Sequence, residues 1–295
     1  MFNPVNKLIA TLPLQLLVRR IRASNSPKPV WLNPDNISID KALRLDLLKD
    51  LYQSDVYNYS VTTALNDRSH GDLFKALNDM FKTKVLHTSV DIQEITGLNA
   101  SSSPISERLS IQEFVEKDCC HLSEVSERSF QANYDHKPIE IIHDPETNDH
   151  LVMYGWSPLL YLSNGNGSHH FAAMRYIASR LNKLVPINAL LELTYLDDDA
   201  VQHFNKNYKC YLFCKDNEDQ LKGMTELNDL PSLFFFNGRY LPYNTGLLMF
   251  HKKDWNLFGF EEKALSSVVT DFNAELEKFC FYQQTNKQFQ ELLSR

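Results

Sequence analysis

The sequence lacks the features that mark membrane proteins, disulfide-rich proteins and proteins that coat nucleic acid. None of its apolar runs approaches the roughly 18–20 residues that a bilayer span requires, so we expect no membrane span. Its five cysteines have no regular spacing, which excludes a disulfide framework and favours reduced thiols in the cytoplasm. The formal net charge is −7 and no dense Lys/Arg run occurs, which argues against broad nonspecific binding to nucleic acid.

What the sequence does contain is the composition of a soluble globular protein. Apolar residues make up 43% and aromatic residues 12% of its 295 residues, enough to build one large domain or two modest ones. No internal repeat and no low-complexity tract interrupts the pattern. We therefore expect a packed core with a mixed α/β fold rather than a repeat array or a disordered chain.

Hydrophobic periodicity divides the chain into three regions. Residues 1–85 are predicted to form a mostly helical N-terminal region, because apolar residues recur at helical spacing over 42–51 and 70–81. Residues 86–196 alternate strands with helices and predict an α/β core, and residues 197–295 predict an α+β extension. The expected strands are 85–95, 138–143, 150–154, 159–162, 185–195, 208–214, 233–236, 239–243 and 246–251, and the later helices are 111–125, 171–181, 260–281 and 288–293.

The most informative segment is 159–181, which reads LLYLSNGNGSHHFAAMRYIASRL. A strand ending at Leu162 is followed by a Gly/Asn/Ser loop with two adjacent histidines, and then by apolar residues at helical spacing. This order directs backbone N–H groups and a helix N-terminus at an anion. The alternative is a tight polar turn in which Ser168 caps the helix and both histidines lie on the surface.

Around this loop the sequence resembles the core of the ParB/sulfiredoxin superfamily. Members of that family have a Pro-Ile-x-Val strand, a second strand, a loop carrying Gly-x-His-Arg, a helix with an Ala-rich start and a strand near Ile-Pro. The matching segments here are Pro138–Ile141, Asn166–His170, Ala172-Ala173 and Val185–Ile187. The likeness falls within residues 86–196 and covers less than half of the chain.

The resemblance implies a nucleotide site that takes ATP or CTP with Mg²⁺, and with it phosphoryl transfer or nucleotide hydrolysis. The residues that would hold the phosphate are Asn166, Gly167, Ser168, His169 and His170. Those that would take part in catalysis are His169, Ser168 and Glu140. The sequence departs from the family at two positions: His170 replaces the family's Arg, and Ser168 stands where sulfiredoxins have a reactive Cys. Reduction of a sulfinic acid is therefore not expected.

Carboxylates that would serve as metal ligands occur in three places. Asp197 and Asp198 are candidate Mg²⁺ ligands, although the Asp197–Asp199 run also fits the cap and first turn of a helix. Glu140 would be a base or a metal ligand if its side chain faces the loop. A third group has metal-ligating residue types but lies in a predicted hairpin turn, where polar residues are common: His143, Asp144, Glu146, Asp149 and His150.

Three classes of function follow from these observations. The first is nucleotide or phosphate binding at Asn166–His170. The second is a non-enzymatic interaction or inhibitor protein, phage- or plasmid-associated, that keeps the fold and binds a protein partner; the loss of the family's Arg at His170 favours it. The third is a nuclease, against which the acidic net charge argues.

Overall fold

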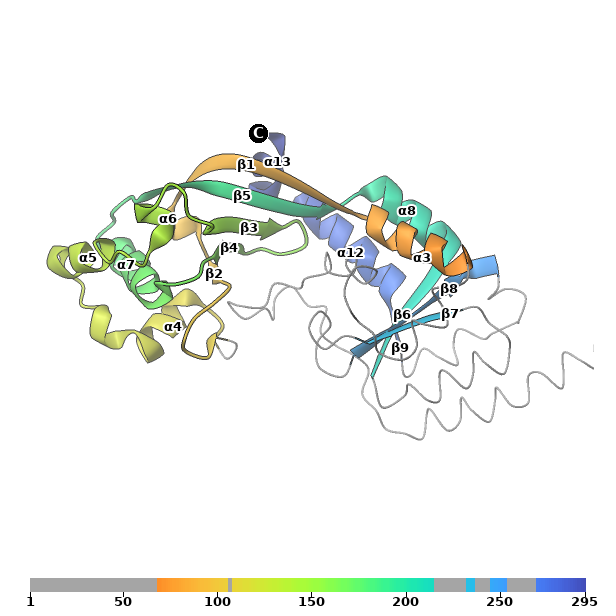
Figure 1. The fold of residues 1–295 in the computed structure, drawn as a ribbon, viewed down its shortest axis with the longest axis horizontal. Helices are drawn as coiled ribbons and strands as arrows, with labels where there is room; N and C mark the ends of the chain where they lie inside the picture. Colours follow the sequence, from red (N-terminus) through yellow and green to blue (C-terminus); the bar gives the residue numbers. More distant parts are fainter. Residues whose placement is uncertain (1–67, 106–107, 215–231, 237–244, 254–268) are drawn as a thin grey trace, which may run out of the picture. The chain divides into compact units, whose positions relative to one another are not determined.

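The computed structural model describes residues 68–105, 108–214, 232–236, 245–253 and 269–295. The helices predicted before residue 68 and the strand predicted at 239–243 lie outside these residues. Within them the protein has the predicted mixed α/β fold, with two separate sheets (Figure 1). No helix in this described part of the chain is long and apolar enough to cross a membrane.

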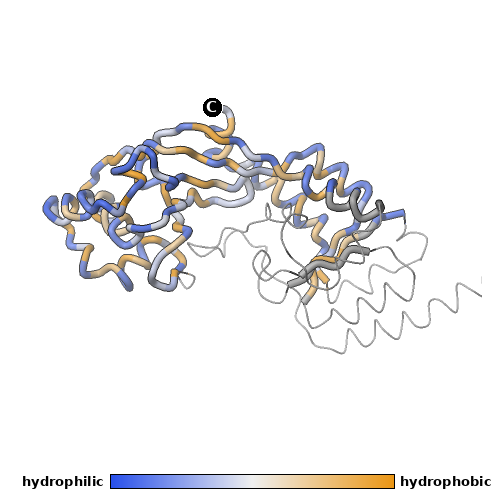
Figure 2. The backbone as a smooth tube through the Cα atoms, in the orientation of Figure 1, coloured by the Kyte–Doolittle hydropathy of each residue, from blue (hydrophilic) through white to orange (hydrophobic). Residues whose placement is uncertain are grey.

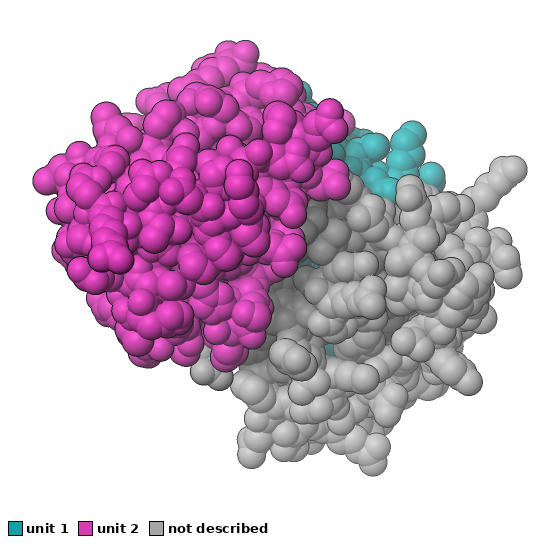
Figure 3. All heavy atoms as spheres, turned by 60° about the vertical axis from the view of Figure 1, so that its left-hand side comes forward, with its two compact units in different colours: residues 1–32, 44–81, 197–279 teal, residues 33–43, 82–196, 280–295 magenta. Residues whose placement is uncertain are grey.

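The chain divides into two compact units, which are coloured in Figure 3. Among the described residues, unit 1 holds 68–81, 197–214, 232–236, 245–253 and 269–279. Unit 2 holds 82–105, 108–196 and 280–295. The glycine-rich loop before residue 168 therefore belongs to unit 2.

Unit 2 is built around a five-stranded sheet in the order β1-β5-β3-β4-β2. Strand β3 pairs in parallel with β5 and antiparallel with β4, and β4 pairs in parallel with β2. Because β4 and β5 lie on either side of β3, the chain between them crosses β3, and α7 (Ser168–Arg180) makes this crossing. The strands are β1 (Phe81–Asp91), β2 (Gly97–Leu98), β3 (His150–Tyr154), β4 (Leu160–Ser163) and β5 (Pro186–Leu196).

The buried face of α7 fixes the position of the loop that precedes it. Each large apolar side chain that leaves water on this face contributes about 1.5–3 kcal/mol to folding. The helix packs against α4 (Ile111–Asp118) and α5 (Glu127–Tyr134), and the three lie together at one end of the sheet (Figure 1). The buried residues of α7 are Ser168, Phe171, Ala172, Ala173, Met174, Ile177 and Ala178.

The helices around α7 begin at capping side chains. Ser110 accepts the N–H of Glu113 at the start of α4, and Ser126 accepts the N–H of Ser129 at the start of α5. Along the helices, orange hydrophobic and blue hydrophilic stretches alternate, as expected for helices with one buried face (Figure 2). The short α6 (Glu140–His143) and the C-terminal α13 (Lys287–Ser294) complete unit 2.

Unit 1 contains a second, four-stranded sheet in the order β7-β8-β6-β9. Its buried Asn273 side chain accepts the N–H of Cys210 and donates to Tyr208 O, which ties the start of α12 to β6. Helix α12 continues past residue 279 into unit 2. The elements are α3 (Arg68–Asp79), α8 (Asp198–Asn207), β6 (Tyr208–Cys214), β7 (Ser232–Phe236), β8 (Thr245–His251), β9 (Val269–Asp271) and α12 (Phe272–Thr285).

Four predicted elements differ from the structure. The predicted strand 85–95 is shifted, because β1 runs from Phe81 to Asp91 and Ile92–Glu94 form a 3₁₀ turn. The predicted strand 138–143 is wrong: Asp144 N–H donates to Glu140 O (2.8 Å), and the segment forms the single helical turn α6. The first strand of the family resemblance is therefore helical here. The predicted helix 111–125 ends at Asp118 and continues as a 3₁₀ turn, Cys120–Leu122. Within the predicted helix 260–281, the described residues form strand β9 (Val269–Asp271) first, and helix α12 begins at Phe272.

Candidate functional site

Helix α7 begins after a glycine in a left-handed conformation. Gly167 is the N-cap residue with φ 78°, a left-handed conformation that favours glycine. A Cβ atom at this position would lie 2.7 Å from Pro138 O, so the chain just before α6 also excludes a side chain here. The first intrahelical hydrogen bond runs from Phe171 N–H to Gly167 O. The N–H groups before it have no hydrogen-bond partner among the described residues, and they are those of Ser168, His169 and His170.

Ser168 is buried and its hydroxyl group is already engaged. It donates to Ala100 O (2.6 Å) and accepts from Asn164 Nδ2 (2.9 Å). Ser168 is also the first residue of α7 and not its N-cap, which corrects the alternative interpretation of the loop as a Ser-capped turn. Because a hydroxyl has one proton to donate, Ser168 would offer an anion its backbone N–H rather than its side chain.

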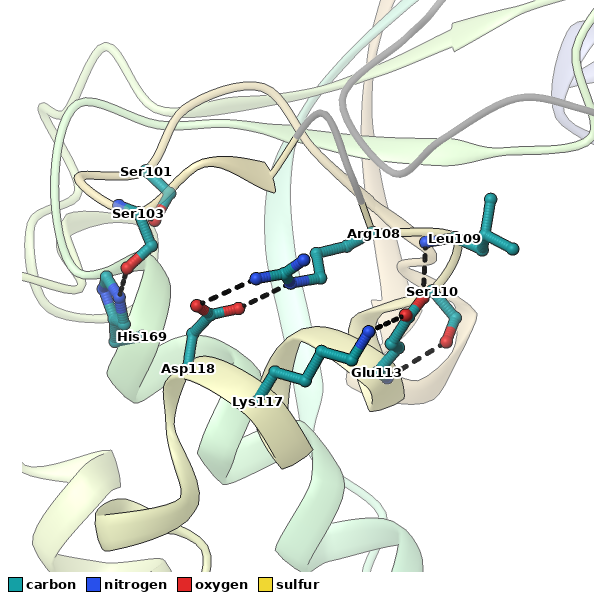
Figure 4. A network of polar contacts seen from close by, with 9 residues as sticks. All are labelled: Ser101, Ser103, Arg108, Leu109, Ser110, Glu113, Lys117, Asp118 and His169. Carbon is teal, nitrogen blue, oxygen red and sulfur yellow. Dashed lines mark hydrogen bonds and ion pairs between the residues drawn. The ribbon is translucent and has the colours of Figure 1, made fainter.

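His169 is held at the edge of the loop by a serine and an aromatic ring. Its Nε2 atom lies 2.8 Å from Ser103 Oγ (Figure 4). The centroid of its ring lies 5.2 Å from that of Phe114. Burial lowers the pKa of His169, and the nearby carboxylate of Asp118 partly offsets this effect. The imidazole is therefore mostly neutral at pH 7.

The Asp118 carboxylate is itself occupied by an arginine. Arg108 donates to both carboxylate oxygens, at 2.8 Å from Nε and 3.3 Å from Nη2 (Figure 4). These hydrogen bonds hold the pKa of Asp118 below its usual range. Asp118 therefore acts on His169 through its charge, while its hydrogen bonds go to Arg108.

His170 has a defined tautomer. Asn133 donates both hydrogens of its Nδ2 atom, to Leu122 O and Ser129 O, so its Oδ1 atom accepts from His170 Nδ1 (2.9 Å). In the neutral ring this leaves the lone pair on Nε2. The ring stacks on that of His136 at a centroid distance of 3.6 Å and an angle of 16°. Burial and then the neighbouring His136 lower the pKa of His170.

Glu140 belongs to a separate hydrogen-bond chain. Its Oε2 atom accepts from Thr147 Oγ1 (3.0 Å), and Thr147 Oγ1 accepts from Asp149 N–H (3.0 Å). Asp149 Oδ1 accepts the N–H of Gly165 (2.9 Å), so this chain of hydrogen bonds reaches the glycine-rich loop at Gly165. Burial raises the pKa of Asp149 and the charge of Glu140 adds to this, while hydrogen bonds from the backbone N–H groups of Gly165 and Ile141 partly offset it.

Asp197 and Asp198 lie at the start of α8 in unit 1. The Asp197 carboxylate accepts the N–H of Ala200 (2.9 Å), so the alternative interpretation as a helix cap is confirmed. In the described part of the chain, no group of three or more His, Cys, Asp or Glu side chains has an arrangement that would hold a metal ion. A Mg²⁺ site at Asp197 and Asp198 remains a prediction.

Of the three expected catalytic residues, the structure holds Ser168 and His169 at the start of α7 and Glu140 in a different chain of hydrogen bonds. Ser168 and His169 face the segment around residues 100–103, whereas Glu140 reaches Thr147. Sequence reasoning missed Asn133, Ser103 and Asn164, since nothing in the local pattern marks a side chain as the partner of a distant one.

The match to a known protein family covers most of the chain. Residues 85–289 match the family described as "Family of unknown function (DUF6685)", and the chain belongs to it. No curated protein and no solved structure matches the chain significantly.

Proposed function

We propose that this member of the family binds a phosphate-bearing small molecule, most simply a nucleotide, at the N-terminal end of α7. The observation that carries the proposal is the group of three N–H donors, at Ser168, His169 and His170, that have no partner among the described residues. Helix N-termini with such donors attract anions, because the helix dipole adds about half a positive charge there. The exposed Gly165 and Asn166 leave the approach to these donors open.

The two histidines support the same proposal. Both are partly buried, and burial lowers the pKa of each, so neither ring carries a full positive charge before a ligand arrives. A phosphate beside them would raise both pKa values, since an opposite charge favours the protonated form. Binding would then take up protons and grow stronger as the pH falls.

Phosphoryl transfer and nucleotide hydrolysis at this loop are suggested by the ParB/sulfiredoxin resemblance alone. Glu140 hydrogen-bonds to Thr147 rather than to either loop histidine. The hydroxyl next to His169 belongs to Ser103, and that of Ser168 donates to Ala100 O. ATP or CTP with Mg²⁺ is the ligand that the ParB/sulfiredoxin resemblance suggests, and that resemblance itself remains a proposal.

A protein-interaction role is the second candidate. Two large apolar residues on adjacent strands of unit 2 are exposed: Val85 on β1 by 60% and Leu190 on β5 by 43%. Exposed apolar residues that lie together are typical of protein interfaces, whereas scattered ones need no explanation. A protein that binds no phosphate compound in the experiment below would be reassigned to this class.

The test is thermal unfolding of the full chain with inorganic phosphate, ATP, CTP, GTP and ADP, each with Mg²⁺. A ligand at about 100 times its dissociation constant adds close to 2.7 kcal/mol of stability. We expect stabilisation by at least one of these compounds and a smaller effect in His169→Ala. His87→Ala, an exposed position on β1, is the control and should respond like the wild type. Stabilisation by none of them at millimolar concentration would refute the proposal.

A further inference from the structure

A serine from another segment of unit 2 lies against the ring of His169. Ser103 Oγ is 2.8 Å from His169 Nε2, and both side chains are partly exposed, so a small molecule can reach them (Figure 4). In the described part of the chain, neither side chain has another hydrogen-bond partner. A hydroxyl at this distance from an imidazole nitrogen is the arrangement in which histidine takes a proton from a nucleophilic serine.

The segment that carries Ser103 is tied to the start of α7. Ser103 N–H donates to Ser101 Oγ (3.1 Å), a local turn that holds the backbone at Ser103. The residue before Ser101 is Ala100, whose carbonyl oxygen accepts from the Ser168 hydroxyl (2.6 Å). The segment is therefore fastened at two neighbouring residues of α7, Ser168 and His169.

His169 has the protonation state that a general base needs. Burial lowers the pKa of its ring, the charge of Asp118 raises it and that of His121 lowers it again. The ring is therefore mostly neutral at pH 7, with one nitrogen able to accept a proton. No residue in the described ranges bonds to Nδ1, so the ring proton can reside there while Nε2 accepts from Ser103.

A carboxylate near the ring would stabilise the positive charge that proton transfer creates. Asp118 acts on His169 through its charge, and the hydrogen bonds from Arg108 keep the pKa of Asp118 low, so it stays ionised. The Asp118 side chain is only 14% exposed, which limits screening by water. Because its printed hydrogen bonds go to Arg108, its effect on the ring is electrostatic alone. This favours esters, which have better leaving groups than amides.

We propose that His169 activates Ser103 as a nucleophile and that the pair hydrolyses small carboxylic esters. Ser103 Oγ bonds to the carbonyl carbon while its proton passes to His169 Nε2. The bond from that carbon to the alcohol oxygen then breaks, and the alcohol takes the proton from Nε2. Water attacks the acyl-serine in the same way: its proton passes to Nε2, the acyl–Oγ bond breaks, Ser103 regains the proton and a carboxylic acid leaves.

The negative oxygen that forms on the carbonyl during each attack needs hydrogen-bond donors. Those nearest to the base along the chain are the N–H groups of Ser168, His169 and His170, which have no partner among the described residues. The assignment of Ser103 does not rest on phosphate binding at these groups, because it comes from the contact between two side chains.

The experiment is reaction of the full chain with a fluorophosphonate, which forms a P–Oγ bond with an activated serine as fluoride leaves. Peptide mass spectrometry gives the modified residue and the rate. The test variant is His169→Gln, whose amide can still hydrogen-bond to Ser103 but cannot take its proton. The control is Ser102→Ala, which removes the exposed hydroxyl next to Ser103.

We expect the probe to modify Ser103 at the same rate in the wild type and in Ser102→Ala, and at least about 100-fold more slowly in His169→Gln. In the wild type the rate should rise with pH as the imidazole loses its proton, a measurement that needs no variant. Hydrolysis of p-nitrophenyl acetate should follow the same order and should be lost in Ser103→Ala.

Three results would each overturn the assignment: no modification of Ser103 at millimolar probe, an equal rate in a folded His169→Gln, or a rate independent of pH between about 5 and 8. Undiminished ester hydrolysis in Ser103→Ala would do so as well. The phosphate proposal fails separately. Modification of Ser103 in a protein that no phosphate compound stabilises would refute only the anion site, and stabilisation without modification would refute only the nucleophile.

Discussion

Replacing Asn166 by Asp should stabilise the unliganded protein and weaken anion binding at the same time. Asn166 is exposed and precedes Gly167, the N-cap residue of α7. A carboxylate here would lie near the N–H groups of the first helical turn, which have no partner among the described residues. A negative charge at this end of a helix contributes about 0.3–1 kcal/mol at low ionic strength.

The same charge acts against a bound phosphate. Two like charges about 4 Å apart repel by about 1 kcal/mol in water, and a phosphate carries about 1.5–2 charges, so the repulsion is about 1.5–2 kcal/mol and affinity should fall roughly 15- to 30-fold. The two effects have opposite signs, and a general loss of folding cannot produce them together. This makes the substitution more informative than one that only removes a side chain.

The assay pairs urea unfolding without ligand with calorimetric titration of the phosphate compound that stabilises the wild type. Asn188→Asp, at an exposed position on β5, adds the same charge away from α7 and should change neither quantity appreciably. Unchanged affinity in Asn166→Asp would refute the placement of the anion at α7. Both the helix effect and the repulsion should shrink when the salt concentration is raised.

Two further predictions concern stability. Gly167→Ala should lower the free energy of unfolding by at least about 1–2 kcal/mol, because alanine is strained at φ 78° and its Cβ would meet Pro138 O. Gly165→Ala, with nothing within 4 Å of the added atom, should stay within about 0.5 kcal/mol of the wild type. Equal effects of the two substitutions in urea unfolding would contradict this. Because burial lowers the pKa values of His169 and His170 from 6.5, their contribution to stability is fully present above pH 6.5 and is lost as the pH falls through the lowered values. Unfolding between about pH 7.5 and 5.5 should therefore depend less on pH in the double Gln variant of these histidines, and an unchanged profile would show that other groups carry the dependence.

The strands and the helix that position the loop could be predicted from local pattern. Strand β3 begins and ends where the sequence predicts, and β4, α7 and β5 do so to within a few residues, because each has a clear apolar periodicity and turn residues at its ends. The segment 138–143 was ambiguous by the same criterion. Its apolar residues Ile139, Ile141 and Ile142 fit both an alternating strand and one helical turn, and the hydrogen bond from Asp144 N–H to Glu140 O decides for the helix.

For the candidate site, the segment that forms it could be predicted from the sequence, but the contacts of its side chains could not. The glycine-rich order identified Gly167 and the helix start, which depend on neighbouring residues alone. The partners of the side chains depend on the register of β3 and β4 and on the packing of α5, which no local pattern encodes. For that reason the roles of Asn133 at His170 and of Asn164 at Ser168 emerge only from the fold.

The most direct test of the central claim is calorimetric titration of the wild-type protein with ATP, CTP and inorganic phosphate in two buffers of different ionisation enthalpy. Anion binding beside His169 and His170 should raise their pKa values, so we expect one binding site and proton uptake that increases as the pH is lowered towards 6. Binding without proton uptake would place the ligand away from these histidines. No binding of any of the three at millimolar concentration would contradict the account.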